Sequence, residues 1–191
     1  MNFLLLKKLR IHTVIQIVLF LALTAFDQIT KSSAAAVLKS GQDITLLDNI
    51  LNFHYLENTG ASFGILKNRL WIFYVITVIV ILLLIFIFLS VYRRTCSYIN
   101  SGRPVLSSKS VSHMIFINYL IAAISAGALG NLIDRISHQY VIDFIELRFI
   151  SFPVFNFADI CITVSAFILI IFFIFVYRED KDISLFKRND K

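Results

Sequence analysis

The sequence is poor in the residues that form disulfides and metal sites. Only two of its 191 residues are cysteines: Cys96 lies in a polar connector and Cys161 inside an apolar run, so a disulfide between them is not expected. The four histidines are His12, His54, His113 and His138. None belongs to an HExxH motif or to any close pair. The pattern therefore predicts no metal ion and no cofactor.

The chain also lacks the GxSxG motif of many serine hydrolases. Ser62 lies in a loop of small residues, and a histidine to act as its base would have to come from elsewhere in the chain. A serine hydrolase is therefore a poor interpretation of this sequence.

Apolar residues are abundant instead. They make up 58% of the chain, and the mean hydropathy is +0.81, more than a soluble domain can bury in one core. Crossing a bilayer takes about 20 apolar residues. Four runs approach or exceed that length, at residues 13–30, 70–92, 111–133 and 159–177. We therefore expect a single α-helical membrane domain with four transmembrane helices.

The basic residues predict how these helices are oriented. Segments 1–12, 93–110 and 178–191 hold twelve of the 18 lysines and arginines, which places both termini and loop 93–110 in the cytoplasm. Loops 31–69 and 134–158 are then extracytoplasmic. The net charge of +6 reflects this topology and attraction to anionic lipids, and it does not indicate nucleic-acid binding.

The start of the chain also has features of a cleavable signal peptide, because a basic segment and an apolar run precede three alanines at residues 34–36. Asp27 and Lys31 interrupt the region before those alanines, so an uncleaved first helix is the better interpretation.

The outer loops have distinct patterns. In loop 31–69, residues 44–47 and 51–56 are short β-prone runs separated by the turn signal Asp48-Asn49, which predicts a small sheet. Loop 134–158 is rich in phenylalanine, and aromatic residues favour the membrane interface. We expect this second loop to lie on the bilayer.

Two aspartates are the strongest candidates for chemistry. Asp143 stands in the apolar pentapeptide 141–145, where a solvated acid would more often have polar neighbours. Asp159 follows sixteen residues later at the start of the fourth run, where a helix dipole also favours a carboxylate. Two carboxylates at close range can share a proton and activate water. The pair therefore indicates peptide hydrolysis.

Polar residues at helical spacing surround these acids. Gly127, Asn131 and Asp134 share one face of the third run, and Arg135 follows. Asn156 precedes Asp159 at the start of the fourth run. The simpler interpretation of Asp134 and Arg135 is an ion pair at a helix end.

Two further segments complete the candidate site. Asp27 and Lys31 stand in the i, i+4 order that stabilises a helix, so a structural role is favoured. Residues 58–64, including Asn58 and Gly60, form a loop suited to laying backbone groups against an extended peptide.

Two other functions fit the composition. A proton- or ion-coupled transporter would use membrane acids as a relay. A helical assembly factor would use the faces of small residues to pack against partners. The acids cluster near the outer ends of the runs and none lies at mid-depth, which favours the protease.

Four motifs together resemble one family. They are DQITK at 27–31, NTGASF at 58–63, GNLIDR at 130–135 with VIDF at 141–144, and FNFAD at 155–159. Their order and separations resemble those of lipoprotein signal peptidase (signal peptidase II), a family of bacterial membrane aspartyl proteases. The resemblance covers residues 27–159.

The resemblance implies a role for each matched residue. Asp143 and Asp159 would be the catalytic pair. Substrate binding or support of the site would fall to a second group: Asn58, Gly60, Asn131, Arg135 and Asn156. Structural support would fall to a third: Asp27, Lys31 and Asp134.

The resemblance also implies the biological setting. The family cuts signal peptides from prolipoproteins just before a diacylglyceryl-modified cysteine, at the extracytoplasmic face of the bacterial inner membrane. Its fold has four membrane helices, a small extracytoplasmic β-sheet and an interfacial helix. The resemblance therefore implies that the protein is a monomer surrounded by membrane lipids. It also implies that the protein needs no cofactor and is inhibited by cyclic peptide antibiotics.

Overall fold

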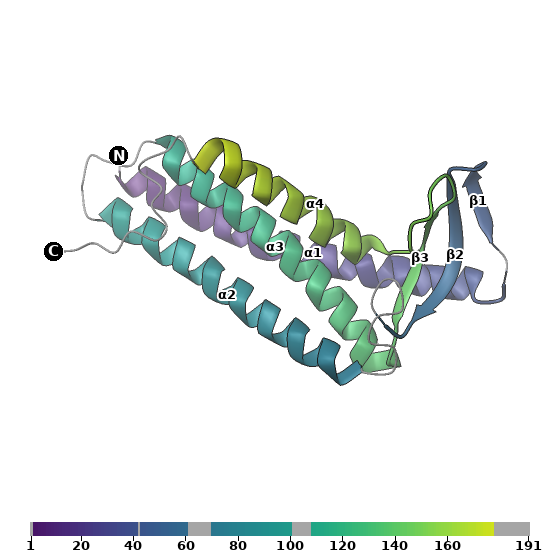
Figure 1. Cartoon of the computed structure of the whole chain (residues 1–191). Helices are drawn as coiled ribbons and strands as arrows, with labels where there is room; N and C mark the ends of the chain where they lie inside the picture. The colour runs from purple at the N-terminus through teal and green to yellow at the C-terminus, as the bar shows by residue number, and fades with distance from the viewer. Residues whose placement is uncertain (1, 42, 61–69, 101–107, 178–191) are drawn as a thin grey trace.

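The computed structural model describes residues 2–41, 43–60, 70–100 and 108–177. Four helices form a bundle: α1 (Asn2–Leu38), α2 (Leu70–Asn100), α3 (Ser108–His138) and α4 (Phe157–Phe172), which continues as a π-helix over Phe173–Tyr177. A three-stranded sheet lies at one end of the bundle, and the start of α1 and the end of α4 lie at the other (Figure 1). The expected class, a four-helix membrane protein with a small sheet, is confirmed.

Helix α3 is the centre of the bundle. In its most apolar stretch 72% of the residues are buried, against 17%, 6% and 17% in α1, α2 and α4. The other three helices therefore turn most of their apolar surface outward, as helices that face lipid do. Residues carried by α3 are held between α1 and α4, away from the surrounding medium.

Small residues allow this close packing. A Cβ added at Gly127 would collide with the backbone oxygen of Ala158 on α4, and one added at Gly130 would collide with the carboxylate of Asp27 on α1. Glycine at these two points lets the three helices approach at the level of the polar residues. The face of α3 that carries Asn131 and Asp134 is buried as a result.

The sheet has the order β1 (Ile44–Leu47), β2 (Leu51–Asn58), β3 (Val141–Leu147), with both pairs antiparallel. The β1–β2 hairpin matches the expected strands. Its turn places Asn49 at a φ of 59°, a conformation that asparagine adopts more readily than most residues.

Strand β3 departs from the expected loop. It pairs with β2 so that Asp143 lies opposite Leu56 and Val141 opposite Asn58. A short apolar run cannot be identified as a strand by its pattern alone, and here the partner strand lies far away in the sequence. The pairing brings Asp143 to the end of the bundle as part of a fixed sheet.

The helices also extend beyond the expected apolar runs. Helix α1 was expected over 13–30 and extends over Asn2–Leu38, and the charge of Lys31 is accommodated in it because this residue binds partners inside the bundle. Within the described residues no separate helix corresponds to the interfacial helix. Of the expected connector 93–110, residues 93–100 belong to α2 and 108–110 to α3. Residues 61–69, 101–107 and 178–191 lie outside the described part of the chain.

Candidate active site

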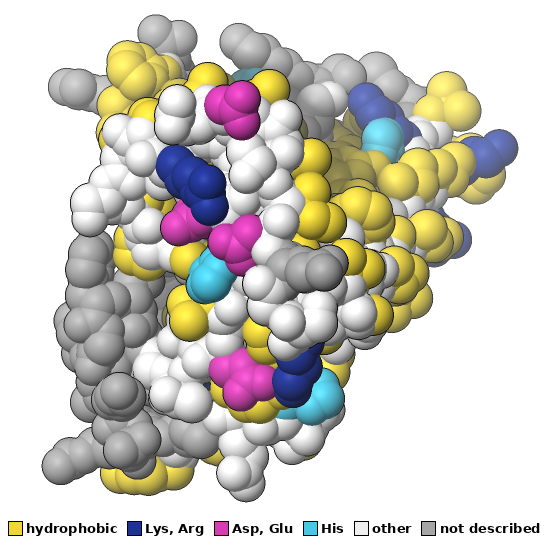
Figure 2. Space-filling model, turned by 90° about the vertical axis from the view of Figure 1, so that its right-hand side faces the viewer, with side chains coloured by type: hydrophobic (Ala, Val, Ile, Leu, Met, Phe, Trp, Pro, Cys, Tyr) yellow, Lys and Arg dark blue, Asp and Glu magenta, His cyan; other side chains and the backbone are white. Residues whose placement is uncertain are grey.

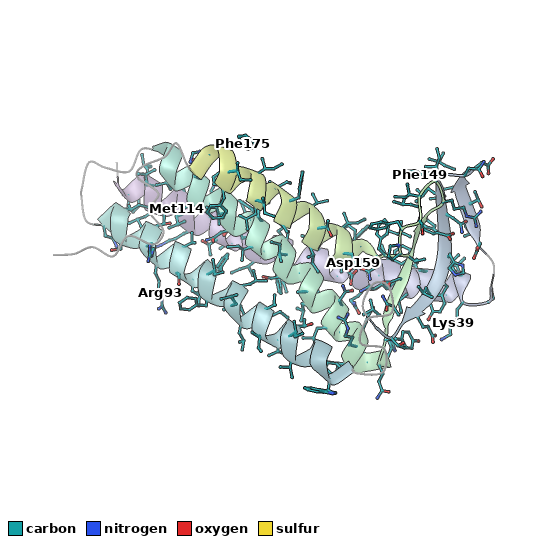
Figure 3. All side chains as sticks on the ribbon, in the orientation of Figure 1. Lys39, Arg93, Met114, Phe149, Asp159 and Phe175 are labelled. Carbon is teal, nitrogen blue, oxygen red and sulfur yellow. The ribbon has the colours of Figure 1, made fainter. Side chains whose placement is uncertain are left out.

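A cavity of about 580 Å³ opens where the sheet meets the bundle. Its lining is partly polar and partly apolar. The polar lining is Asn58, Gly60, Asn131, Arg135, Asp143, Asp159 and Thr163. The apolar lining is Val141, Leu147, Phe152, Pro153, Val154, Phe155, Ile160 and Val164. Of the labelled side chains in Figure 3, Asp159 lies at this junction. The two aspartates singled out in the sequence therefore face one cavity.

Asp143 is held by two amide groups. Its Oδ2 accepts a hydrogen bond from Asn58 Nδ2 at 2.7 Å, and its Oδ1 accepts one from Asn156 Nδ2 at 2.6 Å. The side chain is almost completely buried. Burial raises the pKa of Asp143 to about 7, and the charge of Asp159 adds to this effect although the amide hydrogen bonds oppose it. Asp143 is therefore able to keep a proton near neutral pH.

Asp159 occupies the first turn of α4. Its Oδ2 accepts a hydrogen bond from the backbone N of Asn156 at 3.1 Å, while Asn156 Oδ1 accepts one from the backbone N of Asp159 at 3.1 Å. This reciprocal arrangement is a capping box. Asn131 Nδ2 binds the other carboxylate oxygen at 2.9 Å. The start of the helix thus fixes the position of this acid.

Asn156 joins the two acids. It caps α4 beside Asp159, and its Nδ2 lies within hydrogen-bond distance of both Asp143 Oδ1 and Asn131 Oδ1, at 2.6 and 3.1 Å. The residue is fully buried. A single buried side chain therefore links Asp143 to the first turn of the helix that carries Asp159.

Below the cavity, Lys31 forms a buried charge cluster. Its Nζ lies 2.9 Å from Asp27 Oδ2, 3.1 Å from Asp134 Oδ2 and 2.8 Å from Asn131 Oδ1. The three N–H donors of the ammonium group match these three acceptors. Asp134 pairs here with Lys31, whereas the sequence had indicated the adjacent Arg135 as its simplest partner.

This cluster also determines how Asn131 is oriented. Because an ammonium group only donates, the atom of Asn131 that faces Lys31 must be the oxygen. The amide nitrogen of Asn131 is then directed to Asp159. Lys31 therefore acts on the cavity through one intervening side chain.

Gln28 is part of the same network and was missed in the sequence. Its Nε2 lies 3.1 Å from Asp27 Oδ2, 3.0 Å from Asp134 Oδ1 and 3.1 Å from the backbone oxygen of Gly130. No spacing marks it, and its only signal in the sequence is its place in the DQITK motif at 27–31. Its amide group joins α1 to α3 beside Lys31.

Backbone N–H groups also donate hydrogen bonds to the buried acids. Asp27 Oδ1 accepts a hydrogen bond from Ala158 N at 2.9 Å, and Asp134 Oδ2 accepts one from Ile142 N at 3.0 Å. Asp27 thereby holds the start of α4, and Asp134 holds the start of β3. Both elements carry a candidate catalytic aspartate.

Asn58, Gly60 and Arg135 also line the cavity. Gly60 N donates to Asn58 Oδ1 at 3.0 Å, which directs the amide nitrogen of Asn58 to Asp143. Tyr74 on α2 donates its hydroxyl to the backbone oxygen of Arg135. All the site residues proposed from the sequence are therefore gathered at or directly below the cavity. Positions 61–63 of the second motif lie outside the described residues.

The arrangement suits acid–base chemistry. One acid retains a proton near neutral pH, the other is held in place by N–H donors, and both face a space large enough for a peptide segment. In the described residues no three His, Cys, Asp or Glu side chains gather as metal ligands.

Comparison with known proteins gives the family. The profile of Signal peptidase (SPase) II matches residues 19–175. A lipoprotein signal peptidase of Clostridium tetani is 37% identical over 151 residues, which is 78% of this chain and 85% of the relative. One of Staphylococcus aureus is 33% identical over 167 residues, covering 86% and 90%.

Solved structures agree with this result. A bacterial membrane enzyme determined at 2.3 Å resolution superposes with a TM-score of 0.67 at 28% identity, and the match covers 92% of this chain and 93% of that one. The matched region includes both aspartates of the cavity and the network below them. The chain therefore belongs to the signal peptidase II family of membrane proteases.

Proposed function

We propose that this chain is an aspartic endopeptidase that removes signal peptides from prolipoproteins, cutting just before a diacylglyceryl-modified cysteine. The names of its relatives support the substrate class. The observation that carries the chemistry is that Asp143 and Asp159 line one cavity and are both bound by Asn156. Two acids joined in this way can divide the roles of acid and base.

In the proposed reaction Asp143 begins protonated and Asp159 ionised. Asp159 takes a proton from a water molecule, whose oxygen attacks the scissile carbonyl carbon, while Asp143 gives its proton to the carbonyl oxygen. The C–N bond of the resulting diol then breaks. The leaving nitrogen takes the proton held by Asp159, and Asp143 recovers one from a diol hydroxyl. One water is consumed and both acids return to their starting states.

The rest of the cavity supports substrate binding. Asn58, Gly60 and Arg135 provide further polar groups in the cavity that contains the acids. The apolar part of the lining, which includes Pro153, Phe155 and Ile160, suits apolar parts of a membrane-embedded precursor. A peptide lying across the cavity would place its scissile bond between the carboxylates.

The direct test is to incubate the purified protein with a diacylglyceryl-modified precursor and to measure product masses. The expected products separate immediately before the modified cysteine. An identical precursor with an unmodified cysteine is the matched control, and it should be cut far more slowly. A modified precursor that stays intact, with the protein still folded, would overturn the proposal.

The pH dependence follows from the state of Asp143. Burial raises its pKa to about 7, so the proton needed for the carbonyl oxygen is present below that pH and is lost above it. We expect kcat to fall about tenfold per pH unit above roughly pH 7 and to fall again in acid, when the base becomes protonated. The two apparent constants belong to the pair. A kcat that stays constant from pH 6 to pH 9 would contradict this assignment, because pH 9 lies roughly two units above the pKa of Asp143.

We further propose that the cavity faces away from the cytoplasm. The excess of basic residues at both termini and in the connector 93–110 is the reason. A reporter inserted at Gly41 should therefore be extracytoplasmic, while reporters at Gly102 and after Lys191 should be cytoplasmic. A cytoplasmic signal from Gly41 would reverse the orientation and place the acids on the wrong side.

A further inference from the structure

The far end of the sheet brings two turns together. Leu51 pairs with Leu147, and the backbone N of Arg148 donates to the backbone oxygen of Ile50 at 3.0 Å. The β1–β2 turn and the segment after β3 are therefore neighbours, although about a hundred residues separate them in the sequence.

Six large apolar side chains are exposed at this end, and we call them the apolar tip. They are Leu46, Leu47, Ile50, Phe149, Ile150 and Phe152. Each is between 47% and 59% exposed. A cluster of this kind outside the helix bundle marks a surface that contacts another molecule or a membrane.

The position of the apolar tip indicates what covers it. The sheet crosses the end of the bundle, and the tip lies beyond α4 on the side where α4 forms the outer face (Figures 1 and 3). On that helix Val164 and Phe167 are 50% and 62% exposed, as expected for side chains that face lipid. The apolar tip thus continues the lipid-facing surface of α4 at the level where the helix begins.

The rest of the sheet has the opposite character. Asp43 lies 2.9 Å from His54 Nδ1 and 3.5 Å from Arg148 Nη2, and Glu146 lies 3.3 Å from Arg148 Nε. In the end view, acidic, basic and histidine side chains gather in the middle of the face, and hydrophobic side chains lie along its upper edge (Figure 2). A sheet with one charged face and one apolar end suits the boundary between water and lipid.

We propose that the apolar tip inserts into the interfacial zone of the bilayer beside α4. Its occupant is lipid of the leaflet at the sheet end of the bundle. Strand β3 connects Asp143 to the apolar tip, so the contact between the tip and lipid would fix the position of this strand relative to the membrane surface. Insertion itself depends only on the membrane span of α4 and not on the catalytic assignment.

Tryptophan quenching tests the proposal in the full-length protein. The single tryptophan, Trp71, is first replaced by phenylalanine, and Phe149→Trp is then added as the reporter. The protein is reconstituted without substrate in phosphatidylcholine vesicles whose acyl chains carry bromine either near the carbonyl or near the methyl end. His54→Trp, on the charged face of the same sheet, is the matched control.

We expect bromine near the carbonyl to quench the Phe149→Trp reporter at least about twofold more than it quenches the His54→Trp reporter. Bromine near the methyl end should quench the Phe149→Trp reporter less than bromine near the carbonyl does, because interfacial groups enter only the upper part of the leaflet. A Leu47→Trp reporter on the other turn should behave like the one at position 149. Equal quenching at positions 149 and 54 would overturn the proposal. A blue-shifted but unquenched reporter at 149 would also overturn it, because a protein surface would then cover the tip. Since no precursor is present, the result holds whether or not cleavage is observed.

Discussion

Replacing Asp143 or Asp159 by asparagine is expected to abolish cleavage, with kcat lowered by about 10³-fold or more in each single mutant. Asparagine keeps the size of the side chain but can neither take a proton from water nor give one to a carbonyl oxygen. The double mutant should be scarcely slower than either single mutant, because groups that act as one unit are strongly non-additive.

The structure also predicts the side effects of these substitutions. Both oxygens of Asp143 accept hydrogen bonds from amide N–H groups, so the new amide nitrogen would face a donor. Rotating the Asn58 amide removes that conflict but breaks its hydrogen bond from Gly60 N, at a cost of about 1 kcal/mol. The mutants should therefore accumulate nearly normally and still bind a lipid-modified precursor.

The measurement is single-turnover cleavage of the modified precursor, with binding followed separately. Thr163→Val is a suitable matched control, because it changes a polar residue of the same cavity that has no assigned proton-transfer role. Near-normal cleavage by either asparagine mutant would show that the two acids do not form the catalytic pair.

The four-helix class could be predicted because a membrane-spanning helix needs a long apolar run, and such runs can be recognised in a single sequence. The β1–β2 hairpin was also predictable, since its strands and its Asp48-Asn49 turn are local. Strand β3 was not, because its partner β2 is distant and its apolar run has no unique interpretation. This pairing between distant strands places Asp143 at the cavity, and no local sequence pattern indicates it.

The candidate site was predictable to a similar degree. Side-chain types and helical spacing indicated which faces of α3 and α4 are polar, and the structure places Asn131 and Asp159 together. Spacing could not reveal that Lys31 reaches α3, since that contact depends on how closely the helices approach at Gly130. Gln28 escaped notice for the same reason. Catalytic and binding roles for these residues stay predictions until mutants are measured.

The second large effect is expected from Lys31→Met. The ammonium group is 1% exposed and contacts Asp27 and Asp134, which are equally buried. Without it two carboxylates face each other in a poorly hydrated place, and breaking a buried pair costs about 3–5 kcal/mol. We expect a marked loss of folded protein, measured by thermal unfolding in detergent.

Lys39→Met is the matched control, since it is the same substitution at an exposed lysine whose partner is Glu57. It should leave stability and cleavage nearly unchanged, because exposed ion pairs contribute little. Equal stability of the two mutants would contradict the role of the buried cluster.

A double mutant separates the effect of Lys31 on folding from its effect on the cavity. Adding Asp134→Asn to Lys31→Met removes the repulsion between the two buried acids, so part of the lost stability should return. Activity should not return in full, because Asn131 Oδ1 has lost its ammonium donor at 2.8 Å and keeps the weaker contact from Asn156 Nδ2 at 3.1 Å, so its amide nitrogen is less firmly directed to Asp159. The expected result is a folded protein with a low kcat and a KM close to that of the wild type. Recovery of kcat along with stability would mean that Lys31 supports the fold alone and does not position Asn131.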